Sequence, residues 1–233
     1  MKTLLASAAV LGLLAAGAPF LFAGAPEPVA GSVVQSREWI VHRGAHESEE
    51  FKGDVRYHAG PNVMRADWAL YKHDGKTWNL KGHVRAERTL TSGDVVTAKG
   101  ESAFYDGISR DGWLTGKDGV FLTRQPADGS APDHAVAGRL DWQGEKEAVL
   151  TGDVHAFGPR LESWSDKARY LAAGHETIFS GGRPVARKLF GDWTGALKAD
   201  EIKTYDSPRR MTADGRVVGW IEFPRKSAAR KAP

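Results

Sequence analysis

The sequence predicts an all-β protein, a folded-over antiparallel β-jellyroll built from repeated hairpins. Three observations lead to this fold class. A short phrase recurs along the chain: an apolar residue, a small or polar one, a glycine and then a valine. A second landmark, which ends on an aromatic residue, recurs between these phrases. No convincing amphipathic helix follows residue 36, so strands are expected to make up the repeated units.

The first landmark has three close copies and three looser ones. The close copies are Phe51-Lys52-Gly53-Asp54-Val55, Leu80-Lys81-Gly82-His83-Val84 and Leu150-Thr151-Gly152-Asp153-Val154, and the looser ones run on to Val120, Val185 and Val217. The six valines are 29, 36, 34, 31 and 32 residues apart. A near-constant period of this size is typical of stacked supersecondary units, none of which buries its apolar face alone.

Composition limits the class of protein. The chain has 233 residues, 41% hydrophobic and 26% charged, which is typical of a folded domain and enough to bury a core. It has no cysteine, so a disulfide framework and cysteine-ligated metals are excluded. The net charge is only +3, and basic residues alternate with acidic ones, which argues against nucleic-acid binding.

The first segment indicates export. Residues 3–25 carry no charge and are rich in Ala and Leu, which fits both a signal sequence and a membrane-spanning helix. Both small-x-small cleavage sites are followed directly by proline, Pro19 or Pro26, which favours an uncleaved anchor. We therefore expect an anchor at 1–25, a linker at 26–37, the folded domain at 38–223 and a basic tail at 224–233. A soluble exported protein, released by cleavage, is the alternative.

Each unit is predicted to contain two strands. Turn formers such as Asp74-Gly75 and Asp106-Gly107 separate the aromatic landmark from the next valine, as in a hairpin. Apolar and polar residues alternate through the phrases, which favours strands. Two strands per unit, with edge strands such as residues 38–43, give about ten to fourteen antiparallel strands in one meander. The recurring glycine is interpreted as the place where each long strand bends, which would turn the sheet into a trough.

The usual catalytic motifs are missing. The chain has no phosphate-binding glycine loop, no Gly-x-Ser-x-Gly elbow and no His-Glu-x-x-His site. His42 and His46 lie around a glycine in a strand-like pattern, so we expect a solvated loop and no metal there. Six aspartates recur with the repeat, as turn and edge residues do: Asp54, Asp67, Asp141, Asp153, Asp166 and Asp200. We predict a protein that is not an enzyme, with no catalytic residue, cofactor or metal.

The repeated units resemble a known family. The phrase followed by Ala-Asp-x-Ala-x-Tyr, as in residues 51–71, 80–105 and 150–170 of an exported all-β chain, is similar to the OstA-like lipopolysaccharide-transport proteins. That family includes the periplasmic bridge LptA and the inner-membrane-anchored LptC, and the apolar first segment favours the LptC type. The resemblance implies a V-shaped β-jellyroll, or β-taco, that carries lipid A acyl chains. It also implies a single-pass inner-membrane protein with a periplasmic domain, or, after cleavage, a soluble periplasmic one.

The same resemblance implies partners. They are lipopolysaccharide, the subunits of an inner-membrane ABC transporter, and a second β-jellyroll bridge protein joined end to end, which together pass lipid towards the outer membrane. The unpaired edge strands would make the end-to-end contact, through Trp39 and Val41 at one end and Val217 and Ile221 at the other. From strand parity, the groove lining is predicted to be Val55, Tyr71, Val84, Tyr105, Leu140, Trp142, Val154 and Tyr170.

Two other interpretations stay open on the sequence alone. One is a structural or adhesive β-repeat protein of the cell envelope that binds no lipid. The other is a carbohydrate-active enzyme that uses a carboxylate pair, since repetitive β-helix hydrolases exist. The regular spacing of the aspartates argues against the enzyme.

Overall fold

The computed structural model describes residues 32–90, 92–144, 146–159, 161–190, 193–206 and 209–223. In this part of the chain all strands belong to one antiparallel sheet, so the predicted all-β class is confirmed. The one helical element among these residues is a 3-10 turn, η1 (Ala172–Gly174). No helix in the described ranges is long and apolar enough to cross a membrane. The predicted anchor at 1–25 and the basic tail at 224–233 lie outside the described residues.

The sheet contains 16 strands. Their bounds are β1 (Ser32–Gln35), β2 (Glu38–His42), β3 (Ser48–Ala59), β4 (Asn62–Lys72), β5 (Thr77–Thr89), β6 (Val95–Asp106), β7 (Gly112–Gln125), β8 (Asp133–Gln143), β9 (Glu147–Phe157), β10 (Leu161–Leu171), β11 (Glu176–Ser180), β12 (Val185–Phe190), β13 (Trp193–Lys198), β14 (Glu201–Asp206), β15 (Arg209–Asp214) and β16 (Val218–Glu222). The first strand begins at Ser32, within the range predicted to be a linker.

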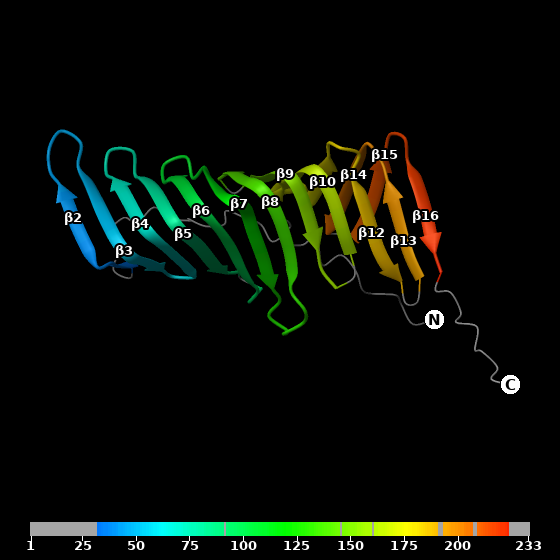
Figure 1. Cartoon of the computed structure of the whole chain (residues 1–233), viewed down its shortest axis with the longest axis horizontal. Coiled ribbons are helices and arrows are strands. Elements are labelled where there is room, and N and C mark those ends of the chain that lie inside the picture. The colour runs from blue at the N-terminus through cyan, green and yellow to red at the C-terminus, as the bar shows by residue number, and fades with distance from the viewer. Residues whose placement is uncertain are drawn as a thin grey trace.

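The strands follow one another across the sheet in chain order. From β3 to β10 each strand pairs with the next, so this part is an antiparallel meander of hairpins. Figure 1 shows the strands side by side along the long axis, from β2 at one end to β16 at the other. The predicted meander is therefore confirmed among the described strands.

The short strands at both ends are halves of longer ones. β11 and β12 both pair with β10, but β11 pairs with residues 167–171 and β12 with residues 161–164. β13 and β14, β15 and β16, and β1 and β2 are separated in the same way. If each pair of halves is counted as one bent strand, the 16 segments make up 12 long strands. This number is within the predicted ten to fourteen.

The sheet therefore consists of two leaves joined along a fold line. The valine leaf contains β1, residues 55–59, 62–66, 84–89, 95–100, 120–125, 133–137, 154–157 and 161–165, and then β12, β13 and β16. The aromatic leaf contains β2, residues 48–52, 68–72, 77–81, 102–106, 112–115, 139–143, 147–151 and 167–171, and then β11, β14 and β15.

The repeated phrase forms the fold line, as predicted. Gly82 and His83 both have positive φ, +73° and +45°, and together they stand opposite the single residue Glu101 of β6. Gly152 and Asp153 have φ of +81° and +46° and stand opposite Asp166 of β10 in the same way. Two residues opposite one is a β-bulge, which bends and twists the strand that contains it. Glycine suits the first position because only it adopts positive φ without steric cost.

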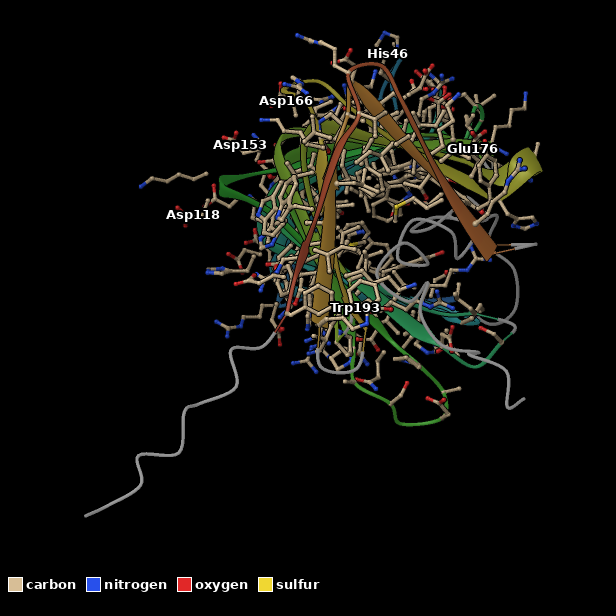
Figure 2. The ribbon with its side chains drawn as sticks, turned by 90° about the vertical axis from the view of Figure 1, so that its right-hand side faces the viewer. His46, Asp118, Asp153, Asp166, Glu176 and Trp193 are labelled. Atoms are coloured by element: carbon tan, nitrogen blue, oxygen red, sulfur yellow. The ribbon has the colours of Figure 1, made fainter. Side chains whose placement is uncertain are left out.

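The core lies between the two leaves. Ala66, Val84 and Met64 are buried on the inner face of the valine leaf, and Tyr105, Leu150 and Tyr170 are buried on that of the aromatic leaf. Figure 2 shows the two leaves in cross-section. Asp118, Asp153 and Asp166 project from the outer side of the fold line, while Trp193 and Glu176 lie towards the free margins of the valine and aromatic leaves.

Candidate functional site

The eight predicted lining residues all face the space between the leaves. Val55, Val84 and Val154 come from the valine leaf, and the other five come from the aromatic leaf: Tyr71, Tyr105, Leu140, Trp142 and Tyr170. Seven of them are buried. Tyr71 is half-buried and packs against Trp78, with ring centroids 4.8 Å apart. Sequence parity thus located the inner face, and the role of these residues in binding lipid stays a prediction.

The fold line explains why Trp68 and Tyr71 have opposite parity. Ala66 and Ala69 are both buried, although they lie three positions apart, and residues on one face of a regular strand lie an even number of positions apart. The inward-facing residues of β4 therefore change from even-numbered to odd-numbered positions where the strand crosses the fold line. Trp68 consequently faces outwards. Its indole Nε1 donates to Glu50 Oε1 at 2.6 Å, and the Lys81 ammonium lies 5.2 Å from its ring centroid.

The interior between the leaves is strongly desolvating. Burial raises the pKa of Tyr105 to about 12 and also raises the pKa of Tyr57. Both shifts have the sign expected when a low-dielectric environment disfavours the phenolate. The phenols of Tyr57 and Tyr105 are therefore neutral at physiological pH.

A polar row crosses the inner face near the free margin of the valine leaf. Asn62, Arg88, Val96, Arg124 and Asp133 are successive register partners on β4 to β8. Their parity matches that of the buried residues Met64, Ala86, Ala98, Leu122 and Ala135, so they face inwards.

An ion pair and a buried acid belong to this row. Arg124 donates through Nη2 and Nε to Asp94 Oδ2, at 2.6 and 2.9 Å, and the Ala127 amide donates to Asp94 Oδ1 at 3.0 Å. Asp133 is 1% exposed, and its Oδ1 has no hydrogen-bond partner in the structure. Burial raises the pKa of Asp133 to about 7, against the opposing pull of Arg124.

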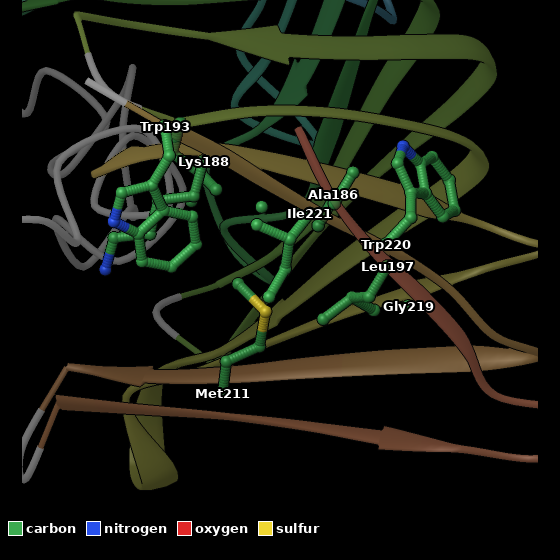
Figure 3. A pocket seen from close by; sticks show the side chains of 11 residues that line it. Ala186, Lys188, Trp193, Leu197, Met211, Gly219, Trp220 and Ile221 are labelled. Carbon is green, nitrogen blue, oxygen red and sulfur yellow. The ribbon is translucent and has the colours of Figure 1, made fainter. Parts of the chain in front are cut away.

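An apolar cavity of about 560 Å³ opens at the β16 end of the molecule. β10, β12, β13, β15 and β16 contribute its lining, which includes Leu161, Ala186, Leu197, Met211 and Ile221. Among the described residues that line it, Lys188 is the only charged one. Figure 3 shows Ile221 pointing towards Met211 across the cavity. We call this cavity the mouth.

The predicted edge residues lie at the two ends of the sheet. Trp39 and Val41 are on β2, whose one partner among the described strands is β3, and they are 63% and 43% exposed. At the other end, Ile221 is on β16, which within the same described set pairs with β13 alone. Val217 directly precedes that strand, and Ile221 and Val217 are 59% and 54% exposed. Each end thus presents exposed apolar side chains beside an unpaired backbone edge, and contact with a partner there stays a prediction.

The histidines and aspartates do not converge. His46 Nδ1 lies 2.7 Å from Asp74 Oδ2 in an exposed loop, and His83 Nδ1 lies 2.7 Å from Asp67 Oδ2 on the outer surface. In the described ranges no three His, Cys, Asp or Glu side chains are placed to hold a metal ion.

The regular spacing of the aspartates has a different origin from the one predicted. Five of the six, all except Asp141, lie on the fold line, so the expectation of turn and edge positions is wrong for them. Asp141 lies within β8, where it accepts three hydrogen bonds from Arg139. Asp67, Asp166 and Asp200 each cover a fold-line glycine of the neighbouring strand, as Asp67 covers Gly82. Asp54 and Asp153 instead follow the glycine of their own strand and are the second residue of the bulge, with φ of +49° and +46°.

Sequence reasoning missed the mouth and the polar row. Lys188 has the parity of Ala186 and is the register partner of the buried Leu161, so alternation within β12 could have identified it as an inward cation. No sequence signal would have assembled the mouth itself, because its walls come from five strands.

Comparisons with known proteins give a fold-level likeness only. No family model matches the chain, and no curated protein matches it in sequence. Among solved structures, the chain is similar to LptH of Pseudomonas aeruginosa, described as the LptA-homologous periplasmic component of a lipopolysaccharide transport device. The two share 13% identity over 65% of this chain and 82% of LptH, with a TM-score of 0.35. A TM-score this low supports no argument about function.

Proposed function

We propose that the protein is a non-enzymatic lipid carrier of the cell envelope, which holds lipopolysaccharide acyl chains between its two leaves. The observation that carries the proposal is the set of buried apolar side chains that extends between the leaves along the sheet, with the mouth at one end. Burying an acyl chain is worth about 0.8 kcal/mol per methylene, so such an interior holds a lipid without covalent chemistry.

The proposed cycle needs partners. Because apolar burial stabilises the bound lipid, net movement requires an external source of free energy. We propose that an inner-membrane ABC transporter loads the interior and that a second β-jellyroll receives lipid at one end. The exposed apolar residues beside the unpaired edges of β2 and β16 support an end-to-end contact.

We also propose that the folded domain is periplasmic and that residues 1–25 anchor it in the inner membrane. The uncharged stretch at residues 3–25 supports this topology. Intact-mass measurement of protein extracted from membranes tests it. A mass that includes Met1–Ala25 supports an anchored receiver, and a mass that lacks them supports a soluble bridge.

Site-specific photo-crosslinking tests the lipid. A photoreactive side chain placed at Tyr105 or Trp142 points into the interior, whereas one placed at the neighbouring Phe104 or Asp141 points outwards and serves as the matched control. Lipopolysaccharide adducts at the inward positions and none at the outward ones are the expected result. Equal labelling at both faces, or none at any inward position, would overturn the proposal.

A structural or adhesive β-repeat protein is the second candidate. Tight burial of the interior favours it, because Val55, Leu150 and Tyr170 are 0% exposed, as in an ordinary sheet core. This candidate predicts that the inward positions give no lipid adduct in cells, while the chain still folds and associates through its edges.

A further inference from the structure

A second hollow lies on the outward side of β10, β12 and β13, beside the fold line, and has a volume of about 250 Å³. Trp164, Val185 and Lys198 line it and are successive register partners on these three strands. Trp164 alternates with the buried Ser163 and Ser165, so the row faces away from the space between the leaves. We call this hollow the outer pocket. It shares no described lining residue with the mouth.

The indole of Trp164 has one covered face and one face towards the outer pocket. His155, its register partner on β9, stacks on the ring with centroids 5.0 Å apart and an interplanar angle of 8°. The residue on the other side, Val185, lines the pocket, whereas His155 does not. The ring is 37% exposed. Because the face of an aromatic ring is negative, it attracts the slightly positive C–H groups of a ligand.

Three charged side chains around the outer pocket lack a partner. Asp153 and Asp166 project outwards from neighbouring strands at the fold line, as Figure 2 shows, and Lys198 lines the same pocket from β13. In the part of the chain that the structure describes, none of the three has a hydrogen bond or an ion pair through its side chain. Opposite charges thus surround one hollow without pairing with each other.

The remaining cation of the lining is already engaged. Arg183 donates through Nη2 to the carbonyl oxygen of Arg216 at 2.8 Å, and its Nε lies 3.6 Å from Asp200 Oδ1. The groups available to a ligand are therefore two acceptors, the carboxylates, and one donor, the Lys198 ammonium. A simple cation would meet the ammonium and a simple anion would meet the carboxylates, so the lining favours a neutral ligand.

A pyranose sugar has the chemistry that this lining matches. Its ring presents an apolar face of C–H groups, and its hydroxyls both donate and accept hydrogen bonds. The volume equals that of roughly eight water molecules, which is enough to receive one such ring. The pocket combines an apolar wall with a few polar groups that converge on one space, as small-molecule sites do.

From these observations we infer that the outer pocket binds a pyranose unit of a carbohydrate, with its C–H face on Trp164 and its hydroxyls between Lys198 and the carboxylates of Asp153 and Asp166. The inference concerns binding only, and no bond is made or broken. It goes beyond the proposed carrier function and does not rest on it, because the pocket and the interior lie on opposite faces of the sheet.

Saturation-transfer NMR tests the site on the full chain, in a detergent that has no sugar head group. The probes are the methyl glycosides of glucose, galactose, mannose and N-acetylglucosamine. At least one should receive saturation on its ring C–H protons and should shift the indole Nε1–H signal that disappears in Trp164→Phe. Absence of binding by all four, or equal binding by cyclohexanol, which has one hydroxyl, would overturn the inference.

A first variant removes the aromatic wall. Trp164→Ala should weaken binding of the glycoside about tenfold, the size expected when one aromatic contact is lost. Phe121→Ala is the matched control, because Phe121 is an outward ring of the same leaf, 36% exposed and stacked on His134, and it does not line the pocket. An equal loss of affinity in both variants would overturn the assignment to Trp164.

Two further variants change charges that the fold does not use. Asp166→Asn and Lys198→Met should each weaken binding about tenfold, as expected when one charge-assisted hydrogen bond is lost, with the thermal unfolding midpoint unchanged within a few degrees. The controls are Asp118→Asn at the fold line and Lys99→Met on β6, both exposed and outside the pocket. Unchanged affinity in both pocket variants would overturn the site.

The source of the sugar unit is distinguished by the trisaccharide of the glycoside that binds. Binding at least as tight as that of the single unit supports the end of a glycan chain as the ligand. Loss of binding on lengthening supports a free sugar.

Discussion

At the scale of single residues, the most informative side chain is Asp133. It is buried on the inner face, its Oδ1 has no partner, and Arg124 beside it is already bonded to Asp94. A carboxyl group in this position is more easily held neutral than ionised. The protein thus contains an acid that titrates near neutral pH at the margin of its interior.

Stability should therefore fall as the pH rises towards and through 7. The folded-state pKa of Asp133 is about 7, above the ordinary value of 3.8, so between these values the folded state binds more protons than the unfolded state. Raising the pH from 5 to 8 should lower the free energy of unfolding by on the order of 2–4 kcal/mol through this group. Urea unfolding at pH 5, 7 and 8 measures it.

Asp133→Asn is the control for that prediction. The amide has the shape of the neutral acid and does not ionise, so the variant should lose most of the pH dependence and be more stable than the unaltered protein at pH 8. The pKa of His83 is also raised, by its hydrogen bond to Asp67. Both proteins contain His83, so its contribution cancels when one pH profile of the free energy of unfolding is subtracted from the other. Identical pH profiles would contradict the assignment to Asp133.

Gly82 provides a second test at the residue scale. Its φ is +73°, and an added Cβ would overlap the carboxylate of Asp67. Gly82→Val should cost at least about 2 kcal/mol and impair lipid passage, because it strains the backbone and displaces the neighbouring strand. Chemical denaturation and a lipid-transfer assay measure the two effects.

Gly60→Val separates strain from overlap. Gly60 also has positive φ, +54°, but a Cβ there meets nothing within 4 Å. The Gly60→Val variant should therefore lose stability through backbone strain alone. A smaller loss of stability and normal lipid passage are expected. Normal folding and transport in Gly82→Val would mean that the glycine at the fold line is merely tolerated.

At the scale of elements, β16 is unusual because both of its faces carry large apolar side chains. Val218 and Trp220 face outwards and are 55% and 48% exposed, beside Glu222 on the same face, while Ile221 faces the mouth. Edge strands of soluble proteins normally carry charges or irregularities that block pairing with another chain. A long-lived monomer with this edge would tend to pair with other chains, which supports its use as an interface.

Charging that edge should prevent end-to-end association. Ile221→Lys places an ammonium on an exposed position, so it should abolish association measured by sedimentation while changing the free energy of unfolding by less than about 1 kcal/mol. Ile108→Lys is the matched control, because Ile108 is 68% exposed in a hairpin turn away from both edges. Association that survives Ile221→Lys would exclude β16 as the contact.

At the scale of the whole molecule, stability should be unevenly distributed along the sheet. The middle strands have neighbours on both sides and inward side chains that fill the core, whereas β15 and β16 each have one neighbouring strand and border the mouth. Local opening should therefore need the least free energy at this end. The mouth lies where the sheet is easiest to deform.

Hydrogen exchange measures this gradient. Backbone amides of β6 to β9 should exchange slowest, and those of β15 and β16 at least tenfold faster. Uniform protection along the sheet would mean that it unfolds as one unit and that its ends are as stable as its centre.

The sequence by itself determined the class, the meander, the inward faces of the strands and the glycines of the fold line. Those features are local, because strand parity has a period of two and a positive φ restricts a single position. Val84, Tyr105 and Gly82 could therefore be assigned from their neighbours along the chain.

The tertiary structure decided the features that depend on which strands face each other. Trp68 and Tyr71 were ambiguous because a bulge changes parity inside one strand. Asp67, Asp166 and Asp200 were misassigned because they cover glycines of a neighbouring strand. The mouth and the polar row at Asp133 arise where residues far apart in the chain meet across paired strands. Cross-strand register sets such contacts, and it is fixed only when the whole sheet folds over itself.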